Sequence, residues 1–394
     1  MTALRDPVAR IDALLGARRQ AGERFFAAEA EQLALLCQAM AERFAAGGRL
    51  LALGRTPAAR SDARHVAVEF VHPVIVGKRA LPALALSAEG GPLARQVELA
   101  ARGDDMAIAF GADDEETAAA LALARERGCL TIATDGARGA AEWSLAPDVA
   151  DPFVCQELIE TSYHLLWELV HVFFEHRGLR SDAGAAGFLY PFLEAQASDL
   201  DAVLDDVRRS ILMKAAEVGE LRAQTVTENA GALCDAAREV RARLDAGGTL
   251  LLLGNGGSAT DAMDAAADLR HPPAGWRPRR VLDLTEDAAI LTALANDIGV
   301  EALFARQVIA YGGPGDALLT FSTSGSSPNV LAALAEGRRR GLFTAALVGY
   351  DGGRVAAERL ADVVIVTRSE HIPRIQEAQA SAWHVLRELL EMAA

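Results

Sequence analysis

The residues best suited to chemistry in this sequence are hydroxyl groups gathered at 322–327, where the chain reads STSGSS. An apolar run ends at Phe321 and Pro328 follows, which predicts a strand, a loop and then a helix that begins at the proline. One serine is enough to cap a helix, so five hydroxyl groups at one helix start favour the binding of an anion such as a phosphate. The alternative is that Ser327 only caps the helix.

A second loop reads GNGGS at 254–258, directly after the apolar run TLLLL. Glycines let a ligand approach the backbone closely, and the helix expected after them presents unpaired N–H groups. The pattern is neither GxGxxG nor a P-loop, so a plain tight turn is the alternative. Because ligands bind where the strands of an open α/β sheet end and helices begin, we expect both loops at one site.

These loops lie in the second of two similar halves of the chain. The segment AAGGRLLALG at 45–54 recurs as DAGGTLLLLG at 245–254, and further matches follow in the same order. Each half begins with a long helical stretch, at about 7–46 and 198–246, and then alternates apolar runs with amphipathic helical ones. We interpret this pattern as a gene duplication followed by divergence.

The alternation predicts an α/β fold with two domains. In each domain a parallel sheet is flanked by helices on both faces and is preceded by the long helix. The predicted domains are residues 1–178 and 198–394, and the segment 179–197, interrupted by Gly, Ser and Pro, is the predicted linker. In the second domain the expected strands are 249–253, 280–284, 317–321, 343–348 and 362–366.

Composition argues against several classes of function. Asp and Glu number 54 against 39 Lys and Arg, and the net charge of −15 argues against a nucleic-acid partner. No apolar run approaches the roughly 18 residues that span a bilayer, and early charges exclude a signal peptide, so no membrane partner is expected. The four cysteines form no CxxC pair, which indicates reduced thiols and a cytoplasmic location.

Four segments taken together, LLLGNGGSATDAM, ANDIG, STSGSSPNV and RIQEAQASAWH, resemble the sugar-isomerase (SIS) family and, within it, the phosphoheptose isomerases. The resemblance is close over about 200–394 and covers 1–178 only in outline. It implies two doubly wound SIS domains, the first of them degenerate. It also implies an isomerase that interconverts sedoheptulose 7-phosphate and D-glycero-manno-heptose 7-phosphate through an enediol, for the synthesis of nucleotide-activated heptose.

The resemblance assigns roles to both loops of the second domain. By position, hydroxyl groups hold the phosphate, while the glycine loop and two polar side chains contact the sugar. The implied phosphate ligands are Ser258, Ser322, Thr323, Ser324 and Ser327, and the other implied contacts are Asn255, Gly256, Gly257 and Asp297.

The family also has four positions that serve acid–base chemistry and that bind zinc in some members. An aldose–ketose isomerisation needs a base for the C–H proton and a group that serves the two oxygens. The implied base is Asp268 by position or Glu69 by chemistry. The implied group at the oxygens is His384 or His164. The implied metal ligands are His65, Glu69, Gln156 and His164 in the first domain, and Asp264, Asp268, Gln376 and His384 in the second.

Each domain departs from the family pattern in its own way. The second has Asp264 and Asp268 where the family has His and Glu, and two solvated helix acids are the alternative there. The first keeps all four acid–base positions but reads FGADDEET at 110–117, where the acidic side chains would repel a phosphate. One domain therefore keeps the phosphate loop, and the other keeps the full acid–base set.

Helix geometry suggests that one site draws on both domains. Gln156 and His164 are eight residues apart, about 12 Å along a helix axis, whereas metal–ligand bonds are about 2 Å long. We therefore predict pockets at the interface of the two domains, with His164 or His384 donated by a neighbouring helix. The alternative for His164 is a buried helix histidine, and Trp383 is expected only to pack the last helix.

Two other functions stay open at this point. A non-catalytic regulator that binds a sugar phosphate would need the serine loop but no base, and an isomerase could act on another sugar phosphate. The expected partners are a phosphorylated heptose and a second copy of the chain, as a homo-oligomer built from a dimer of tandem chains. Zinc is the one cofactor expected, because neither a nucleotide nor a nicotinamide fingerprint appears.

Overall fold

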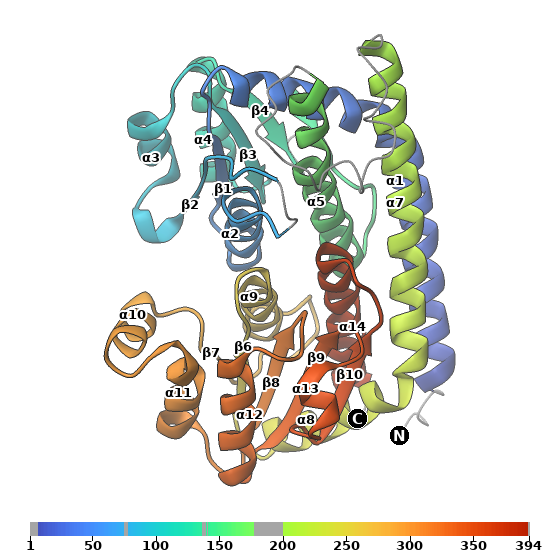
Figure 1. Ribbon diagram of the computed structural model, residues 1–394, viewed down its shortest axis with the longest axis vertical. Coiled ribbons are helices and arrows are strands. Elements are labelled where there is room, and N and C mark those ends of the chain that lie inside the picture. Colours follow the sequence, from blue (N-terminus) through green and yellow to red (C-terminus); the bar gives the residue numbers. More distant parts are fainter. Residues whose placement is uncertain (1–6, 75–77, 136–138, 140, 177–199, 393–394) are drawn as a thin grey trace. The chain divides into compact units, whose positions relative to one another are not determined.

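The chain forms two compact units in the computed structural model (Figure 1). The N-terminal unit is Ala21–Glu217, and the C-terminal unit is Val218–Ala394 together with Met1–Gln20. The predicted linker 179–197 lies outside the described residues, and the predicted domain boundaries stay a prediction. The structure describes residues 7–74, 78–135, 139, 141–176 and 200–392.

The N-terminal unit contains a five-stranded parallel sheet in the order β2-β1-β3-β4-β5. The long helices α1 and α7 each contribute residues to both units. The elements up to α7 are α1 (Pro7–Ala45), β1 (Leu50–Gly54), α2 (Pro57–Val71), β2 (Ala83–Ser87), η1 (Ala88–Gly90), α3 (Leu93–Ala100), β3 (Met106–Phe110), α4 (Glu115–Glu126), β4 (Leu130–Ala133), β5 (Trp143–Ser144), α5 (Pro152–His176) and α7 (Leu200–Glu228).

The C-terminal unit contains a second five-stranded parallel sheet, in the order β10-β9-β8-β6-β7. All five strands predicted for this half are confirmed, and so is the α/β class. None of the described helices has the length and apolar character that crossing a bilayer requires. The elements are α8 (Ala230–Asp245), β6 (Leu250–Leu253), α9 (Gly257–Arg270), β7 (Val281–Asp283), α10 (Ala288–Asp297), η3 (Val300–Ala302), α11 (Leu303–Tyr311), β8 (Ala317–Ser322), α12 (Pro328–Arg339), β9 (Phe343–Gly349), α13 (Gly353–Ala357), β10 (Val363–Thr367) and α14 (Ile372–Met392).

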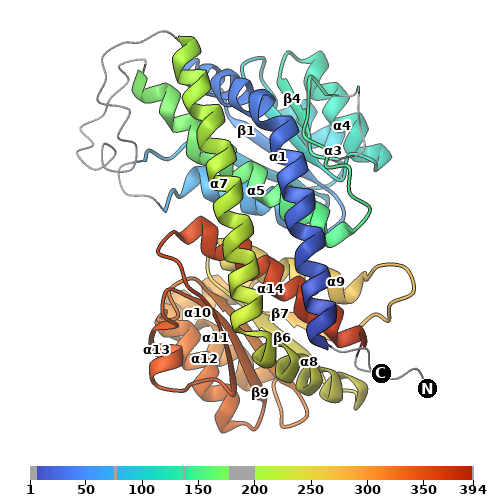
Figure 2. The same cartoon turned by 90° about the vertical axis from the view of Figure 1, so that its right-hand side faces the viewer.

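Strand β6 shows why an unbroken apolar run forms the middle of this sheet. Its alternate side chains point to opposite faces, so Leu250 and Leu252 join one core, while Leu251 and Leu253 join another. Helices α8, α9 and α14 cover the first face, and α11 and α12 cover the second (Figures 1 and 2). Because both faces are buried under helices, the strand needs apolar residues at every position.

The predicted helix over 198–246 is divided in the structure at Asn229. Helix α7 ends at Glu228 and α8 begins at Ala230. The amide nitrogen of the Asn229 side chain donates to the carbonyls of Thr225 and Val366, and its oxygen accepts from the Val366 backbone N–H. An asparagine side chain that bonds to backbone groups competes with the hydrogen bonds of the helix backbone. Here it connects the junction between α7 and α8 to β10.

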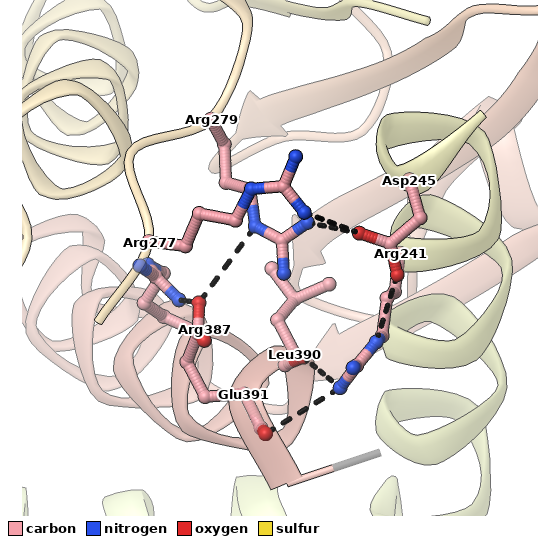
Figure 3. Close-up of polar contacts among 7 residues, drawn as sticks. All are labelled: Arg241, Asp245, Arg277, Arg279, Arg387, Leu390 and Glu391. Atoms are coloured by element: carbon pink, nitrogen blue, oxygen red, sulfur yellow. Dashed lines mark hydrogen bonds and ion pairs between the residues drawn. The ribbon is translucent and has the colours of Figure 1, made fainter. Parts of the chain in front are cut away.

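Basic side chains and two carboxylates join α8 to the end of α14 in the C-terminal unit. Figure 3 shows Asp245 accepting from Arg279 and, at 3.2 Å, from Nε of Arg241. Glu391 accepts from Arg387 at 2.6 Å, and Arg279 lies 3.8 Å from Glu391. Arg279 therefore lies between the carboxylates of two helices.

Replacement of Asp245 by Asn is expected to lower Tm at neutral pH, with a difference that disappears in acid. The hydrogen bond from Arg279 is the first cause that lowers the pKa of Asp245; burial opposes it and Arg241 adds to it. A lowered folded-state pKa stabilises the fold above the unfolded value of about 3.9, and this contribution is lost as pH falls through the folded-state value. Thermal unfolding of wild type and D245N between pH 7 and pH 2 measures this. A difference in Tm that is the same at all pH values would contradict it.

Candidate active site

The glycine loop of the C-terminal unit turns the chain sharply from β6 into α9. A Cβ atom on Gly254 would lie 2.1 Å from the backbone oxygen of Ser258, and Gly256 has a φ of 56°. Both positions therefore require glycine. The turn places Ser258, which is buried, in the first turn of α9.

The serine loop between β8 and α12 is held in shape by its own hydroxyl groups. The Oγ atom of Ser322 accepts from the Gly325 N–H at 3.1 Å, and that of Ser326 accepts from the Arg354 N–H at 3.1 Å. Gly325 has a φ of 58°, and a Cβ atom there would lie 2.4 Å from a backbone oxygen. The loop is thus a fixed turn and not a free connection.

Two hydroxyl groups of this loop meet at the start of α12. Ser327 is the N-cap residue, yet its side chain makes no capping hydrogen bond to the helix. Its Oγ lies 3.5 Å from Oγ of Ser324 instead. The interpretation of Ser327 as only a cap is therefore wrong. Two hydroxyl groups at the N-terminal end of a helix, where the helix dipole is positive, form a suitable site for an anion.

Asn255 is paired with a residue that the sequence did not single out. Its side-chain amide donates to Oδ1 of Asn329 at 3.0 Å and accepts from Nδ2 of Asn329 at 2.9 Å. Asn329 lies in the first turn of α12 and is buried. This reciprocal pair joins the glycine loop to the serine loop. The polar residue directly after Ser327-Pro328 was the only signal for it in the sequence.

Asp297 lies at the end of α10, an apolar helix none of whose residues is buried. Its Oδ1 accepts from the side chain of Asn296 at 2.7 Å. Directly after the helix, Ile298 and Val300 are 55% and 59% exposed. The expected sugar contact therefore lies at the end of an apolar helix that is followed by exposed apolar side chains.

The implied acid–base pair of the C-terminal unit comes from α9 and α14. Asp268 and His384 are both buried, and Nε2 of His384 lies 3.8 Å from Oδ2 of Asp268. Burial raises the pKa of the Asp268 carboxyl, while His384 is the first of the groups that oppose this. Asp264 is half-buried one turn earlier on α9, and Gln376 is buried on α14.

In the N-terminal unit the predicted residues His65 and His164 meet. Their Nε2 atoms are 3.3 Å apart, and both side chains are buried, on α2 and α5 respectively. Oε1 of Glu69 lies 3.9 Å from Nε2 of His65. Burial, and then the neighbouring His164, lower the pKa of His65 well below its usual value. The imidazole of His65 is therefore neutral, which is the form that binds a metal.

Glu160 joins these two histidines, although it was not predicted. One ligand atom from each of His65, Glu160 and His164 lies within 4.8 Å of the others. Glu160 precedes His164 by four residues, as His65 precedes Glu69, and that spacing was the signal in the sequence. Gln156, the residue implied by the resemblance, is half-buried two turns before His164 on α5.

The loops of the N-terminal unit carry internal ion pairs where the C-terminal unit has hydroxyl groups. Arg55 forms an ion pair with Asp114, whose carboxylate also caps α4 by accepting from the Thr117 N–H at 3.0 Å. Asp135 accepts from the N–H groups of Gly111 and Ala112 at 2.8 and 2.7 Å. Carboxylates of this unit therefore occupy the backbone donors that follow β3.

The family to which this chain is similar was identified mainly from residues of the C-terminal unit. A family model described as a SIS domain matches residues 215–349. A phosphoheptose isomerase of Nitratidesulfovibrio vulgaris is 38% identical over 188 residues, which are 48% of this chain and 89% of that protein. One from Chlorobaculum parvum is 47% identical over 149 residues, 37% of this chain and 70% of that protein.

Solved structures extend the likeness in fold to nearly the whole chain. The C-terminal domain of glucosamine-fructose-6-phosphate aminotransferase from Francisella tularensis has a TM-score of 0.60 at 9% identity, with 96% of this chain and 94% of that one covered. Tagatose-6-phosphate ketose/aldose isomerase from Escherichia coli has a TM-score of 0.56 at 14% identity, with 97% and 93% covered. These two show the fold alone, whereas the closer relatives are matched over most of their own length. The chain therefore belongs to the phosphoheptose isomerase family of SIS-domain sugar-phosphate isomerases.

Proposed function

We propose that the C-terminal unit interconverts sedoheptulose 7-phosphate and D-glycero-manno-heptose 7-phosphate. The observation that carries this is the pair of hydroxyl groups of Ser324 and Ser327 at the start of α12, a site suited to a phosphate. The pair Asp268 and His384 in the same unit supplies a carboxylate and an imidazole. The family membership supports a sugar phosphate as the substrate.

In the proposed mechanism the serine loop fixes the substrate by its phosphate. The Asp268 carboxylate takes the proton from the carbon next to the carbonyl, the electron pair forms the enediol, and the proton returns to the adjacent carbon. His384 moves the other proton between the two oxygens. Burial favours this role of Asp268, because a carboxylate in a dry site is a stronger base than one in water.

The experiment that tests the proposal is NMR of sedoheptulose 7-phosphate incubated with the purified chain. Formation of the aldoheptose phosphate is the expected result. Saturable binding without turnover would instead favour the regulator, which needs the phosphate loop and no base. Turnover of a hexose or amino-sugar phosphate alone would keep the isomerase and change its substrate.

We further propose that zinc binds in the N-terminal unit, to His65, Glu160 and His164. Two imidazoles and a carboxylate are a donor set typical of zinc sites that keep one position open, so the residues fit this ion. Zinc held there would act as a Lewis acid toward an oxygen of a bound ligand. Carboxylates already pair with Arg55 and with the backbone donors after β3 in this unit, so we expect the phosphate to bind in the C-terminal unit.

Added zinc is expected to raise the Tm of the chelator-treated protein, and H164A is expected to abolish that rise. H171A is the matched control, because His171 is a buried histidine on the same helix whose ring nitrogens lie 2.9 and 3.1 Å from the carbonyl oxygens of Trp167 and Arg79. Differential scanning calorimetry with and without zinc measures both variants. A rise that survives in H164A and is lost in H384A would place the ion in the C-terminal unit.

We also propose that the protein is cytoplasmic and that two of these tandem chains form a homodimer. The exposed apolar side chains of α10 and of Ile298 and Val300 support self-association, because surfaces of this kind commonly mark protein contacts. Light scattering after size-exclusion chromatography tests the assembly, and a monomer at micromolar concentration would overturn it.

A further inference from the structure

Trp383 connects two parts of the C-terminal site. It lies on α14 with 1% of its surface exposed, and its indole N–H donates to Oδ2 of Asp268 at 2.7 Å. Its ring meets the ring of Phe321 edge-on, with centroids 6.4 Å apart. Phe321 directly precedes Ser322, so one side chain contacts both the implied base and the strand that leads into the serine loop.

Packing alone does not account for this hydrogen bond. The expectation from sequence was that Trp383 only packs the last helix. Trp167 on α5 is also fully buried, and its indole N–H has no hydrogen-bond partner among the described residues. The fold therefore tolerates an unpaired indole N–H, at the usual cost of a buried donor. Burial of the indole therefore does not by itself explain why the N–H of Trp383 donates to a carboxylate.

The N-terminal unit repeats the arrangement with different residues. At the position of Trp383 in the sequence repeat stands Tyr163, whose hydroxyl lies 2.9 Å from Nδ1 of His65. The ring of Tyr163 meets the ring of Phe110, the last residue of β3, at a centroid distance of 6.0 Å. In both units an aromatic residue of the last helix thus holds a site residue of the helix after the first strand.

We propose that Trp383 is a positioning residue that sets the rotation of the Asp268 carboxylate. This inference rests on the proposed function, in which Asp268 takes the substrate proton. The indole N–H occupies Oδ2, while none of the described residues donates a hydrogen bond to Oδ1, so Oδ1 is the oxygen left for the proton. Aspartate is one methylene shorter than the glutamate of the family, and a shorter side chain leaves less freedom to correct a misplaced oxygen.

The variant W383F keeps an aromatic ring and removes the N–H donor. We expect kcat to fall by about 10–100-fold with KM changed less than about twofold, because the serine loop still binds the phosphate. W276F is the matched control, since Trp276 is a half-buried tryptophan of the same unit whose ring stacks on Arg387 and whose indole is not bonded to Asp268. It should keep wild-type kcat. An unchanged kcat in W383F, with folding verified by its Tm, would overturn the inference.

A double-mutant cycle separates positioning from a general loss of structure. If Trp383 acts through Asp268, W383F should cause no further loss in the D268N background. A further loss of tenfold or more there would overturn the inference.

One further readout needs neither turnover nor a folded W383F protein. The indole N–H signal of Trp383 in ¹⁵N NMR should shift between wild type and D268N, and an unchanged signal would overturn the contact itself. If the signal differs between wild type and D268N but the wild type isomerises no sugar phosphate, the proposed function is refuted and the contact between Trp383 and Asp268 stands. An active wild type with a fully active W383F would refute only the positioning role.

Discussion

Replacing Asp268 with Asn is expected to lower kcat for sugar-phosphate isomerisation by about 10²–10⁴-fold. The amide has nearly the shape of the carboxylate, but it cannot take a proton from carbon. KM should change only a few-fold, because Asp268 is not a phosphate ligand: the implied ligands lie in the serine loop and, with Ser258, in the first turn of α9. NMR in D₂O measures both the product and the incorporation of deuterium at the carbon that exchanges its proton.

Two variants make this result interpretable. D283N is the matched control, since Asp283 is another buried aspartate of the same unit, and its carboxylate accepts from the N–H and hydroxyl of Thr285. It should keep the wild-type kcat. If D268N retains full activity and E69Q loses it, the base is Glu69 of the N-terminal unit, which was the alternative drawn from its chemistry.

The double variant S324A/S327A is expected to weaken binding of sedoheptulose 7-phosphate by about 100-fold or more. Hydrogen bonds to a charged group contribute about 1.5–3 kcal/mol each, and about 1.4 kcal/mol corresponds to a tenfold change in Kd. Both hydroxyl groups lie at the start of α12, 3.5 Å apart, so they are placed to act on the same phosphate. Isothermal titration with the sugar phosphate and with inorganic phosphate measures the loss.

The neighbouring Ser326 provides the control within the same loop. Its Oγ accepts from the Arg354 N–H, and Ser326 is not one of the implied phosphate ligands, so S326A should change Kd by only a few-fold. The stoichiometry carries a second result. Wild type is expected to bind one phosphate per chain, because Arg55 and the backbone donors after β3 are already paired with carboxylates. A second phosphate bound per chain would instead indicate a phosphate site in the N-terminal unit, and tight binding that persists in S324A/S327A would contradict the role of this hydroxyl pair.

The fold was largely predictable because its strongest signals are local. Apolar runs between helical segments predicted all five strands of the C-terminal sheet, and the buried β6 is an example. The break at Asn229 was not predictable, because it depends on hydrogen bonds from that side chain to Val366 in β10. A contact between residues so far apart in sequence leaves no pattern near either one.

The candidate site was predictable only where a residue had a counterpart to be compared with. His65 and His164 fit the repeat and the resemblance, and the structure brings them together. Glu160 has Ala380 at its place in the second copy, so comparison of the halves concealed it. Asn329 and Trp383 looked like ordinary helix residues. Each forms a hydrogen bond to a side chain far away in the sequence, and such contacts leave no regular spacing by which they could be predicted.

The division of α1 between the two units has a consequence for the order in which the chain folds during synthesis. Ile11 and Leu14 are made long before the rest of the core in which they are buried, which includes Val226 and residues as late as Leu390. The residues of the N-terminal unit, Ala21–Glu217, are all made before those of the C-terminal unit that follow Glu217, so Ile11 and Leu14 wait for partners made much later. Closing so long a loop costs entropy and slows folding. Ile11 and Leu14 thus stay exposed until the last part of their core has been made.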